Sequence, residues 1–474
     1  MAQKIKADIC VIGAGSGGLS VAAGAAQMGA RTVLIESGEM GGDCLNTGCV
    51  PSKALIAAAK HAWTMGEGEP FGIARAKPKI DFEKVNAHVK EVIAAIAPND
   101  SVARFESLGV TVIKDHARFK DARTVIAGRK EIQARRFVVA TGSHPAVPPI
   151  PGLDTVPFLT NETIFGLTTK PDHLIVIGGG PIGMEMAQAH RRLGCNVTVI
   201  EAAKVMAKDD PELVAFVVDR LTREGVEILE GAKVASVEAV EDGIAVTVET
   251  AEKSRRIEGT HLLVATGRKP TVDGLDLEKA GIVADVHGIV VDDRLRTKNR
   301  RVFAIGDVIG GLQFTHVANY HAGIVIRNAL FRLPAKVDYG SIPWVTYTDP
   351  ELAHVGMTEA EARAAHMKIN VLRWHLAEND RAQASRETDG EIKLVTDMHS
   401  RVLGCTIVGP HAGELILPWV LAKSQALKLS AMAGIVAPYP TLSEISKRAA
   451  SSYYTPTLFS AKTRAIVRFL GLFG

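Results

Sequence analysis

The sequence predicts an α/β fold with two similar Rossmann-like domains, and two observations lead to this class. A block of strand, glycine-rich turn, helix and second strand occurs twice, at an offset of 165 residues. A strand-like run that ends in Ala-Thr-Gly also occurs twice. Short apolar strands that alternate with helical segments are typical of βαβ units on a parallel sheet.

Both blocks contain an apolar strand, three spaced glycines and a second strand followed by an acid. The first block consists of residues 9–12, Gly13, Gly15, Gly18, residues 31–35 and Glu36, and the second of residues 174–177, Gly178, Gly180, Gly183, residues 196–200 and Glu201. The first glycine permits a tight turn, the second admits a pyrophosphate, and the third lets helix and strand pack closely. The acid accepts hydrogen bonds from an adenosine ribose. One such motif also fits a turn in any α/β protein, but two with correctly placed acids predict two dinucleotide sites.

The Ala-Thr-Gly elements place Thr141 and Gly142 in the first domain and Gly267 in the second. The distance from the glycine turn to this element is 40 residues longer in the first copy. We therefore expect an insertion in the first domain.

The insertion contains two cysteines, Cys44 and Cys49, before an alanine-rich helix that begins near Pro51. A thiolate at Cys49 would be stabilised by the positive helix end, and Lys53 lies one turn further on. Half a zinc site and two unrelated buried thiols are the alternatives. No second Cys or His pair has metal-ligand spacing, so we expect no metal site and favour a redox dithiol.

Composition excludes several functional classes. The 55 basic and 52 acidic residues give a net charge of +3, too low for the basic field of a nucleic-acid-binding protein. Five cysteines are too few for a secreted disulfide framework, so we expect a cytoplasmic protein. The other three, Cys10, Cys195 and Cys405, lie in apolar runs and are expected to be buried and inert.

With these motifs, the chain resembles the FAD-dependent pyridine nucleotide–disulfide oxidoreductases, which include dihydrolipoamide dehydrogenase, glutathione reductase and mercuric reductase. The resemblance covers almost the whole chain and includes residues 302–307, Val-Phe-Ala-Ile-Gly-Asp. It implies an FAD-binding domain at 1–150, an NAD(P)-binding domain at 151–270, a central domain at 271–340 that completes the FAD site, and an α+β dimerisation domain at 341–474.

The resemblance also implies residue roles. Glu36 and the first glycine turn would bind the adenosine half of FAD, Asp307 the ribityl chain, and the segment that ends at Ala318 the flavin ring. Cys49 would be the thiol beside the flavin and Cys44 the thiol that meets the substrate. Lys53, paired with Glu185, would lie near the flavin.

The second glycine turn would then bind the nicotinamide cofactor. Glu201 suits a free 2′-hydroxyl, so we expect NAD(H) rather than NADP(H), although Lys204 keeps NADP(H) open. Electrons would pass from the nicotinamide through the flavin and the dithiol to a small disulfide, or in reverse from a dithiol.

The resemblance implies a homodimer whose active sites are shared between subunits, with Glu444 as the orienting acid of the partner. Tyr439 stands where dihydrolipoamide dehydrogenase and glutathione reductase have histidine. A tyrosine with a pKa of about 10 is poorly suited to shuttle a proton near neutrality. His316, on one predicted helix with His321, is a possible substitute base.

Two other departures concern the substrate. Mercuric reductases share the tyrosine but carry a C-terminal cysteine pair that this sequence lacks. Asp43 replaces the commoner threonine and is expected to raise the pKa of its neighbour Cys44.

Three hypotheses follow. The chain is a dihydrolipoamide-dehydrogenase-like disulfide oxidoreductase, a mercuric-type metal-ion reductase that uses the inner dithiol alone, or a flavin redox sensor or complex component. The basic and apolar tail, residues 461–474, is expected to dock on the chain or on a partner, and membrane contact is not expected.

Overall fold

The computed structural model describes residues 3–251, 253–365 and 368–473. The chain divides into two compact units, each assembled from separate stretches. The first comprises Met1–Gly178, Ala189–Ile200 and Ala232–Val337, and the second comprises Gly179–Gln188, Glu201–Gly231 and Asp338–Gly474. The finer division into four domains stays a prediction.

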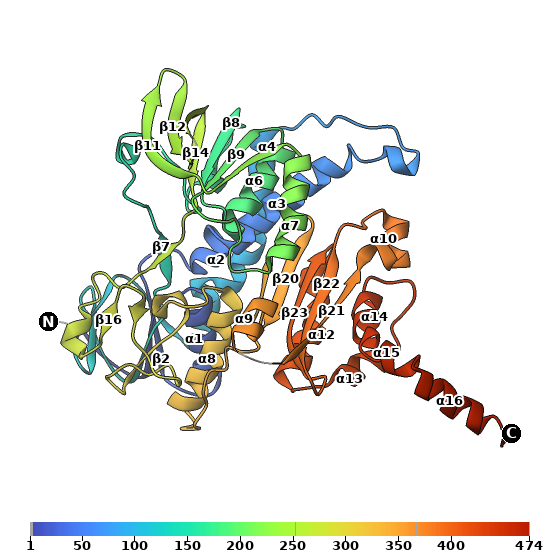
Figure 1. Cartoon of the computed structure of the whole chain (residues 1–474). Coiled ribbons are helices and arrows are strands. Elements are labelled where there is room, and N and C mark those ends of the chain that lie inside the picture. Colours follow the sequence, from blue (N-terminus) through green and yellow to red (C-terminus); the bar gives the residue numbers. More distant parts are fainter. Residues whose placement is uncertain (1–2, 252, 366–367, 474) are drawn as a thin grey trace. The chain divides into compact units, whose positions relative to one another are not determined.

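The main sheet of the first unit contains the first Rossmann-like copy (Figure 1). Its strands, in spatial order, are β3 (Thr111–Lys114), β2 (Thr32–Glu36), β1 (Gln3–Ile12), β6 (Lys130–Val139), β5 (Thr124–Ala127) and β4 (Ala117–Asp121), with β18 (Val302–Ala304) also on β6. The pairs among β3, β2, β1, β6 and β18 are parallel, whereas β5 and β4 add an antiparallel edge. A strand from beyond residue 300 thus completes a sheet that begins at residue 3.

Both faces of this sheet are buried around the C-terminal half of β1, which explains why Ile9–Ile12 is apolar without alternation. Ile9 and Val11 face one core, with residues of α1 and α8, while Cys10 and Ile12 face the other. The helices of this unit are α1 (Ser16–Gln27), α2 (Gly42–Asn46), α3 (Cys49–Thr64), α4 (Phe82–Ile96), α5 (Val102–Ser107) and α8 (Thr315–Ala329).

The second Rossmann-like copy supplies a smaller parallel sheet and an antiparallel one. The parallel strands, in spatial order, are β9 (Asn196–Glu201), β8 (His173–Ile177) and β14 (His261–Val264). Along the chain, β8 leads through the glycine turn into α6 (Pro181–Arg192). The antiparallel strands are β11 (Lys233–Val240), β12 (Gly243–Glu249) and β13 (Ser254–Gly259). Two short antiparallel pairs lie outside these sheets. They are β7 (Ser143–Pro145) with β15 (Arg268–Pro270), and β16 (Ala284–Asp285) with β17 (Gly288–Ile289).

The second unit is built on a five-stranded antiparallel sheet. Its order is β19 (Pro343–Thr346), β20 (Glu351–Gly356), β23 (Val402–Gly409), β22 (Glu391–Asp397) and β21 (Ile369–His375). The other elements are α7 (Pro211–Arg223), β10 (Val226–Glu230), α9 (Glu359–Ala364), α10 (Asp380–Ser385), α11 (Ala412–Leu415), α12 (Leu417–Ser424), α13 (Leu429–Ala433), α14 (Glu444–Ser452), α15 (Thr455–Leu458) and α16 (Ala461–Leu470).

The core of the second unit combines apolar packing with a buried charge cluster. Trp419 is fully buried, and its indole N–H donates to the Oγ of Ser446 at 2.9 Å. Helix α7 packs on β20 and β23. The buried ammonium of Lys393 on β22 lies 2.8 Å from Asp210, which caps α7.

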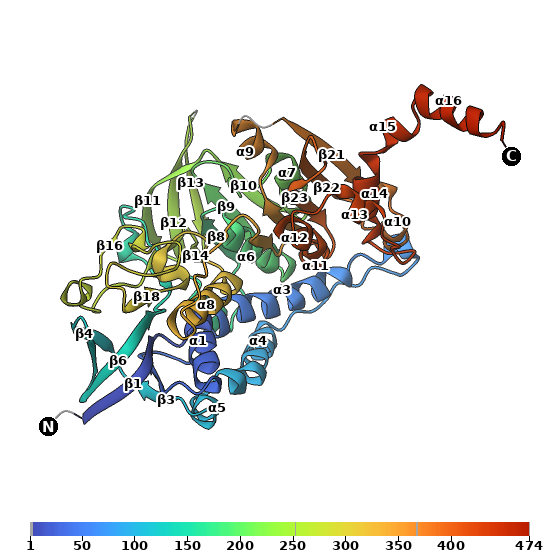
Figure 2. The same ribbon diagram turned by 90° about the horizontal axis from the view of Figure 1, so that it is seen from below.

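The C-terminal tail forms α15 and α16, which extend away from the rest of the second unit in both views (Figure 1, Figure 2). Every residue of α16 is described, and none is buried. The helix is therefore not docked on its own chain, and the alternative, packing on a partner, stays a prediction. Among the described residues, no helix is long and apolar enough to cross a membrane.

Candidate active site

The two cysteines of the insertion lie on consecutive helices. Cys44 is part of the short α2, and Cys49 is the first residue of α3, where unpaired N–H groups make the helix end positive. Both are free thiols. This places Cys49 where a thiolate is stabilised, as the sequence predicts.

The two thiols differ in proton affinity. A hydrogen bond from Cys44 is the largest cause that lowers the pKa of Cys49 to about 6, with Thr315 and the charge of Lys53 acting in the same direction against burial. The same hydrogen bond and burial raise the pKa of Cys44. At neutral pH the pair therefore holds one proton, on Cys44, and one negative charge, on Cys49.

Asp43 does not act on its neighbour Cys44 as the sequence suggested. Its charge raises the pKa of Cys49 instead, and its two oxygens belong to a hydrogen-bond network of their own. The Oδ1 atom accepts hydrogen bonds from Thr47 at 2.8 Å and from Asn161 at 3.0 Å. The Oδ2 atom pairs with Arg268 at 3.3 Å.

Arg268 connects this network to Asp307. The guanidinium Nε donates to the Ser143 hydroxyl at 2.7 Å, and that hydroxyl donates to Asp307 Oδ2 at 2.6 Å. Burial is the main cause that raises the pKa of Asp307, while Ser143 and Arg268 oppose it. A partly buried carboxylate held in this way supplies acceptor oxygens for the hydroxyl groups of a ribityl chain.

The first glycine turn fits a dinucleotide. Gly13 has φ +102°, and a Cβ there would collide with the carbonyl of Ala140. A Cβ on Gly15 would meet nothing within 4 Å, so this chain gives no steric reason for a glycine at that position. A pyrophosphate close to the backbone supplies one. Glu36 accepts hydrogen bonds from the N–H groups of Ala14 at 2.5 Å and Gly38 at 2.6 Å.

The second turn repeats this arrangement. Gly178 has φ +108° and approaches the carbonyl of Ala265, whereas Gly180 again faces open space. Glu201 accepts hydrogen bonds from Gly179 at 2.8 Å and Ala203 at 2.9 Å, each 165 residues after its counterpart. Lys204, which kept NADP(H) open, forms an ion pair with Glu230 at 2.6 Å.

The Ala-Thr-Gly elements and α8 lie near these sites in the first unit. Thr141 donates to the carbonyl of Thr271 at 2.7 Å, and Gly142 and Gly267 both have positive φ. Ala318 lies in the first turn of α8, which begins at Thr315. Gly18 lies in α1, where a Cβ would strike the carbonyl of Gly13, and Gly183 lies in α6.

The two predicted histidines share α8 but differ in setting. The ring of His316 stacks on Phe314 with 5.3 Å between centroids. His321 is buried, accepts a hydrogen bond from the N–H of Gly306 at 3.2 Å, and has a pKa lowered to about 4 by burial. His321 is therefore a neutral acceptor that holds the loop of Asp307.

Three further predicted residues belong to the second unit. Glu185 is buried and accepts a hydrogen bond from the N–H of Tyr347 at 2.9 Å. The Tyr439 hydroxyl donates to Asp380 at 2.9 Å, and this bond raises the pKa of the tyrosine. Glu444 begins α14. Lys53 belongs to the first unit, so its pairing with Glu185 stays a prediction.

The remaining cysteines are buried, as expected. Burial raises the pKa of Cys195 to about 11 and also raises those of Cys10 and Cys405. Within the described residues, no group of three His, Cys, Asp or Glu side chains could hold a metal ion.

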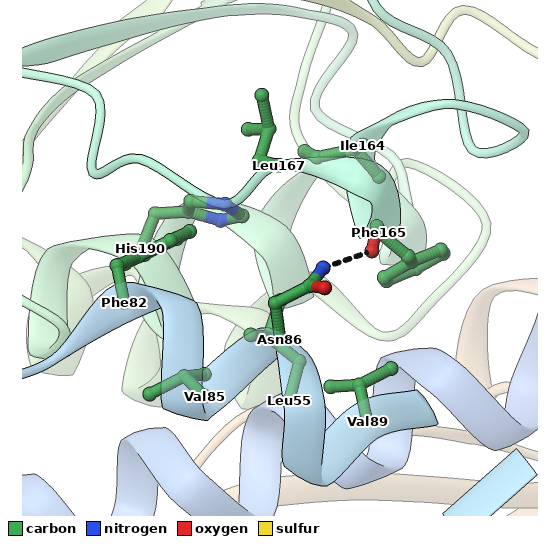
Figure 3. Close-up of a pocket in the computed structure, with 9 residues that line it drawn as sticks. All are labelled: Leu55, Phe82, Val85, Asn86, Val89, Ile164, Phe165, Leu167 and His190. Carbon is green, nitrogen blue, oxygen red and sulfur yellow. Dashed lines mark hydrogen bonds between the residues drawn. The ribbon is translucent and has the colours of Figure 1, made fainter. Parts of the chain in front are cut away.

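A small pocket in the first unit is separate from these residues (Figure 3). Its lining is apolar except for Asn86 and His190, and the Asn86 amide donates to the carbonyl of Phe165 at 2.7 Å. The lining includes none of the predicted site residues, so the pocket is not a candidate catalytic site.

Sequence reasoning missed four contributors, namely Ser143, Asn161, Arg268 and Asp380. The sequence offered a clue to two of them, because Ser143 and Arg268 each directly follow an Ala-Thr-Gly element. Asn161 and Asp380 had none, since only folding brings them to Asp43 and Tyr439.

Comparisons with known proteins agree with this architecture. The family described as pyridine nucleotide-disulphide oxidoreductase matches residues 7–322, and its dimerisation domain matches residues 342–450. A mercuric reductase of Bacillus cereus is 36% identical over 450 residues, 94% of this chain and 71% of that protein. A dihydrolipoyl dehydrogenase of Geobacillus stearothermophilus is 35% identical over 94% of this chain and 96% of its own length.

Solved structures are similar along the same length. LpdA from Mycobacterium tuberculosis has a TM-score of 0.86 at 28% identity and covers 95% of this chain and 99% of its own. The Cu(II) complex of the HOCl-induced flavoprotein disulfide reductase RclA from Escherichia coli has a TM-score of 0.84 at 28% identity, with 94% and 99% covered.

Proposed function

Because this chain belongs to the pyridine nucleotide–disulphide oxidoreductase family, we propose that it is a cytoplasmic, NADH-dependent reductase of a small disulfide. The chain is a flavoprotein oxidoreductase that acts on sulfur groups with FAD and a nicotinamide cofactor. Its dimerisation domain implies a homodimer. To this family assignment our proposal adds the electron donor, the acceptor, the location and the roles of single residues.

The opposite proton affinities of Cys44 and Cys49 carry this proposal. Bound FAD would supply the two-electron relay from NADH to the Cys44–Cys49 disulfide. In the resulting dithiol, the Cys49 thiolate is the nearest acceptor for the Cys44 proton. The Cys44 sulfur then attacks one sulfur of the substrate, and the first leaving thiolate takes the proton. Attack by Cys49 on the mixed disulfide releases the second thiolate and restores the Cys44–Cys49 disulfide.

The protonation of Tyr439 bears on which substrates the dithiol can turn over. Its hydrogen bond to Asp380 raises its pKa, so the phenol keeps its proton at neutral pH. A group that keeps its proton cannot serve as the base that dihydrolipoamide oxidation requires. We infer that Tyr439 and Glu444 face the partner subunit's dithiol, and that dihydrolipoamide is a poor substrate.

NADH is favoured by the setting of Glu201. Its carboxylate is fixed on the glycine turn by Gly179, where it would repel a 2′-phosphate. Lys204 is engaged by Glu230 and is therefore a weak candidate for binding that phosphate.

A metal-ion reductase is the second candidate. Relatives include mercuric reductases, and RclA has been solved as a Cu(II) complex. Metal ions that bind sulfur displace thiol protons without a base, so the tyrosine would be no handicap. The substrate ion would then be held by the inner dithiol alone.

Steady-state oxidation of NADH and NADPH with lipoamide, oxidised glutathione, Hg(II) and Cu(II) in parallel separates these functions. Turnover of a disulfide with NADH supports the proposal, whereas turnover of a metal ion alone supports the second candidate. Full FAD loading without turnover of any acceptor would favour a redox sensor.

The role of Cys49 has a separate spectroscopic test. Anaerobic two-electron reduction should give a long-wavelength thiolate–flavin absorption band that Cys49→Ser abolishes and Cys44→Ser keeps. A band that survives Cys49→Ser would show that the assignment of the two thiols is wrong.

A further inference from the structure

The C-terminal helix α16 and the three residues after it carry six large apolar side chains that a single chain leaves in solvent. Their exposed fractions run from 48% for Ile466 to 78% for Leu472, and the others are Val467, Phe469, Leu470 and Phe473. Exposed apolar groups in one contiguous patch mark an interaction surface. Both views show the helix extending away from the rest of its unit (Figure 1, Figure 2).

The helix is amphipathic. With 3.6 residues per turn, Ile466, Phe469 and Leu470 fall on one side, and Arg464 and Arg468 fall on the opposite side. The rings of Phe469 and Phe473 meet edge to face with centroids 5.2 Å apart, so the apolar side continues past the helix end.

The charge of this segment differs from that of the rest of the chain. The last 30 residues contain five basic residues and no acidic one, namely Lys447, Arg448, Lys462, Arg464 and Arg468. Because the whole chain has a net charge of only +3, the remaining residues are net acidic. The segment therefore concentrates positive charge beside an exposed apolar face.

The sequence alone favours docking of this tail over membrane contact, but the exposed apolar side reverses that preference. We propose that residues 455–473 bind the surface of an anionic phospholipid bilayer. A helix with Phe and Leu on one side and Arg on the other lies in the interfacial plane, with the apolar side among the acyl chains. The absence of acidic residues complements anionic head groups. The interface between two copies of a chain is depleted of charge at its centre, so a second copy fits less well. The segment directly follows the dimerisation domain, so each dimer presents two copies and binds by avidity.

Flotation of the FAD-loaded full-length protein with vesicles tests this proposal. We expect binding to vesicles with about 30 mol % phosphatidylglycerol and little binding to pure phosphatidylcholine, because the head-group charge contributes. Each basic side chain near such a surface contributes about fivefold, so Arg464→Gln with Arg468→Gln should weaken binding by roughly 30-fold per chain. Phe469→Asp with Leu470→Asp, and a chain that ends at Ser460, should not bind.

Matched controls change equivalent groups elsewhere. Val286→Asp replaces another exposed apolar side chain, and Lys233→Gln with Lys298→Gln removes two exposed charges. These variants should bind like the unmodified chain. All variants should keep NADH oxidation and dimer mass in solution, because the residues changed are exposed.

Three results would overturn the proposal. They are equal binding of the unmodified and shortened chains, equal binding to charged and neutral vesicles, and loss of the dimer in the shortened chain. The last result would assign the helix to the interface with a second copy.

Discussion

The Sγ atom of Cys49 lies 3.4 Å from the Oγ1 atom of Thr315. Cys49 is the first residue of α3 and Thr315 is the first residue of α8, so the starts of two helices meet at one sulfur atom. Residues 266 positions apart thus stabilise the same negative charge.

Thr315→Val should raise the pKa of Cys49, because it removes a hydrogen bond that favours the thiolate. Hydrogen bonds to charged groups contribute about 1.5–3 kcal/mol, so we expect a rise of roughly one to two pKa units from about 6. The pH dependence of Cys49 alkylation in the reduced protein measures this shift. Thr457→Val, at an exposed position, is the control, and an unchanged profile for Thr315→Val would contradict the role of this bond.

Asp43→Asn should act in the opposite direction. The carboxylate charge raises the pKa of Cys49, so its removal should lower that pKa and move the alkylation profile to lower pH. The profile should not move in Asp154→Asn, which changes an exposed carboxylate elsewhere. A shift to higher pH would contradict this effect of the carboxylate on Cys49.

His321 should make stability depend on pH. Its folded pKa of about 4 lies below the ordinary value of 6.5, so between these values the unfolded chain binds a proton that the folded chain excludes. The free energy of unfolding should therefore fall as the pH falls from 6.5 towards 4. Thermal unfolding at pH 7 and pH 5 should show a smaller loss for His321→Gln than for the unmodified chain, while His399→Gln, at an exposed site, should behave like the latter.

Lys393→Met should destabilise the second unit strongly. Its buried ammonium lies within 2.9 Å of Asp210, Glu212 and Glu359, and its loss leaves three carboxylates facing one another. Removal of one partner from a buried ion pair costs about 3–5 kcal/mol. Chemical denaturation measures this change. As a control, Lys279→Met breaks the exposed pair with Asp276, and there we expect a loss of at most about 1 kcal/mol. Similar losses in both variants would refute the distinction.

The repeated elements could be predicted from the sequence because their cause is local. A tight turn needs a glycine with positive φ, and a strand buried on both faces needs continuous apolar residues, so Gly13 and the run through Ile12 are readable without a structure. The acid that follows each strand is fixed by the same local geometry, and Glu36 and Glu201 indeed hold corresponding N–H groups.

The other features of the site and of the fold depend on contacts between segments that are distant in the sequence. The sequence predicts an effect of Asp43 on Cys44, whereas the Asp43 carboxylate pairs with Arg268, which lies 225 positions away. The cap of α7 at Asp210 belongs in sequence to the second Rossmann-like copy, yet it is neutralised by Lys393 of the C-terminal sheet. No pattern within either segment contains that information.

The backbone at Gly15 tolerates a side chain, so a glycine at this position is retained for the ligand and not for the fold. Its φ of −77° suits any residue, and an added methyl group would meet no atom of the chain within 4 Å. A screen for folding alone should therefore accept alanine at this position, whereas a screen for yellow, flavin-loaded protein should reject it. At Gly13 both screens should reject alanine, since φ +102° and the Ala140 carbonyl penalise it before any cofactor arrives. Comparison of the two screens would distinguish glycines retained for the fold from those retained for the ligand.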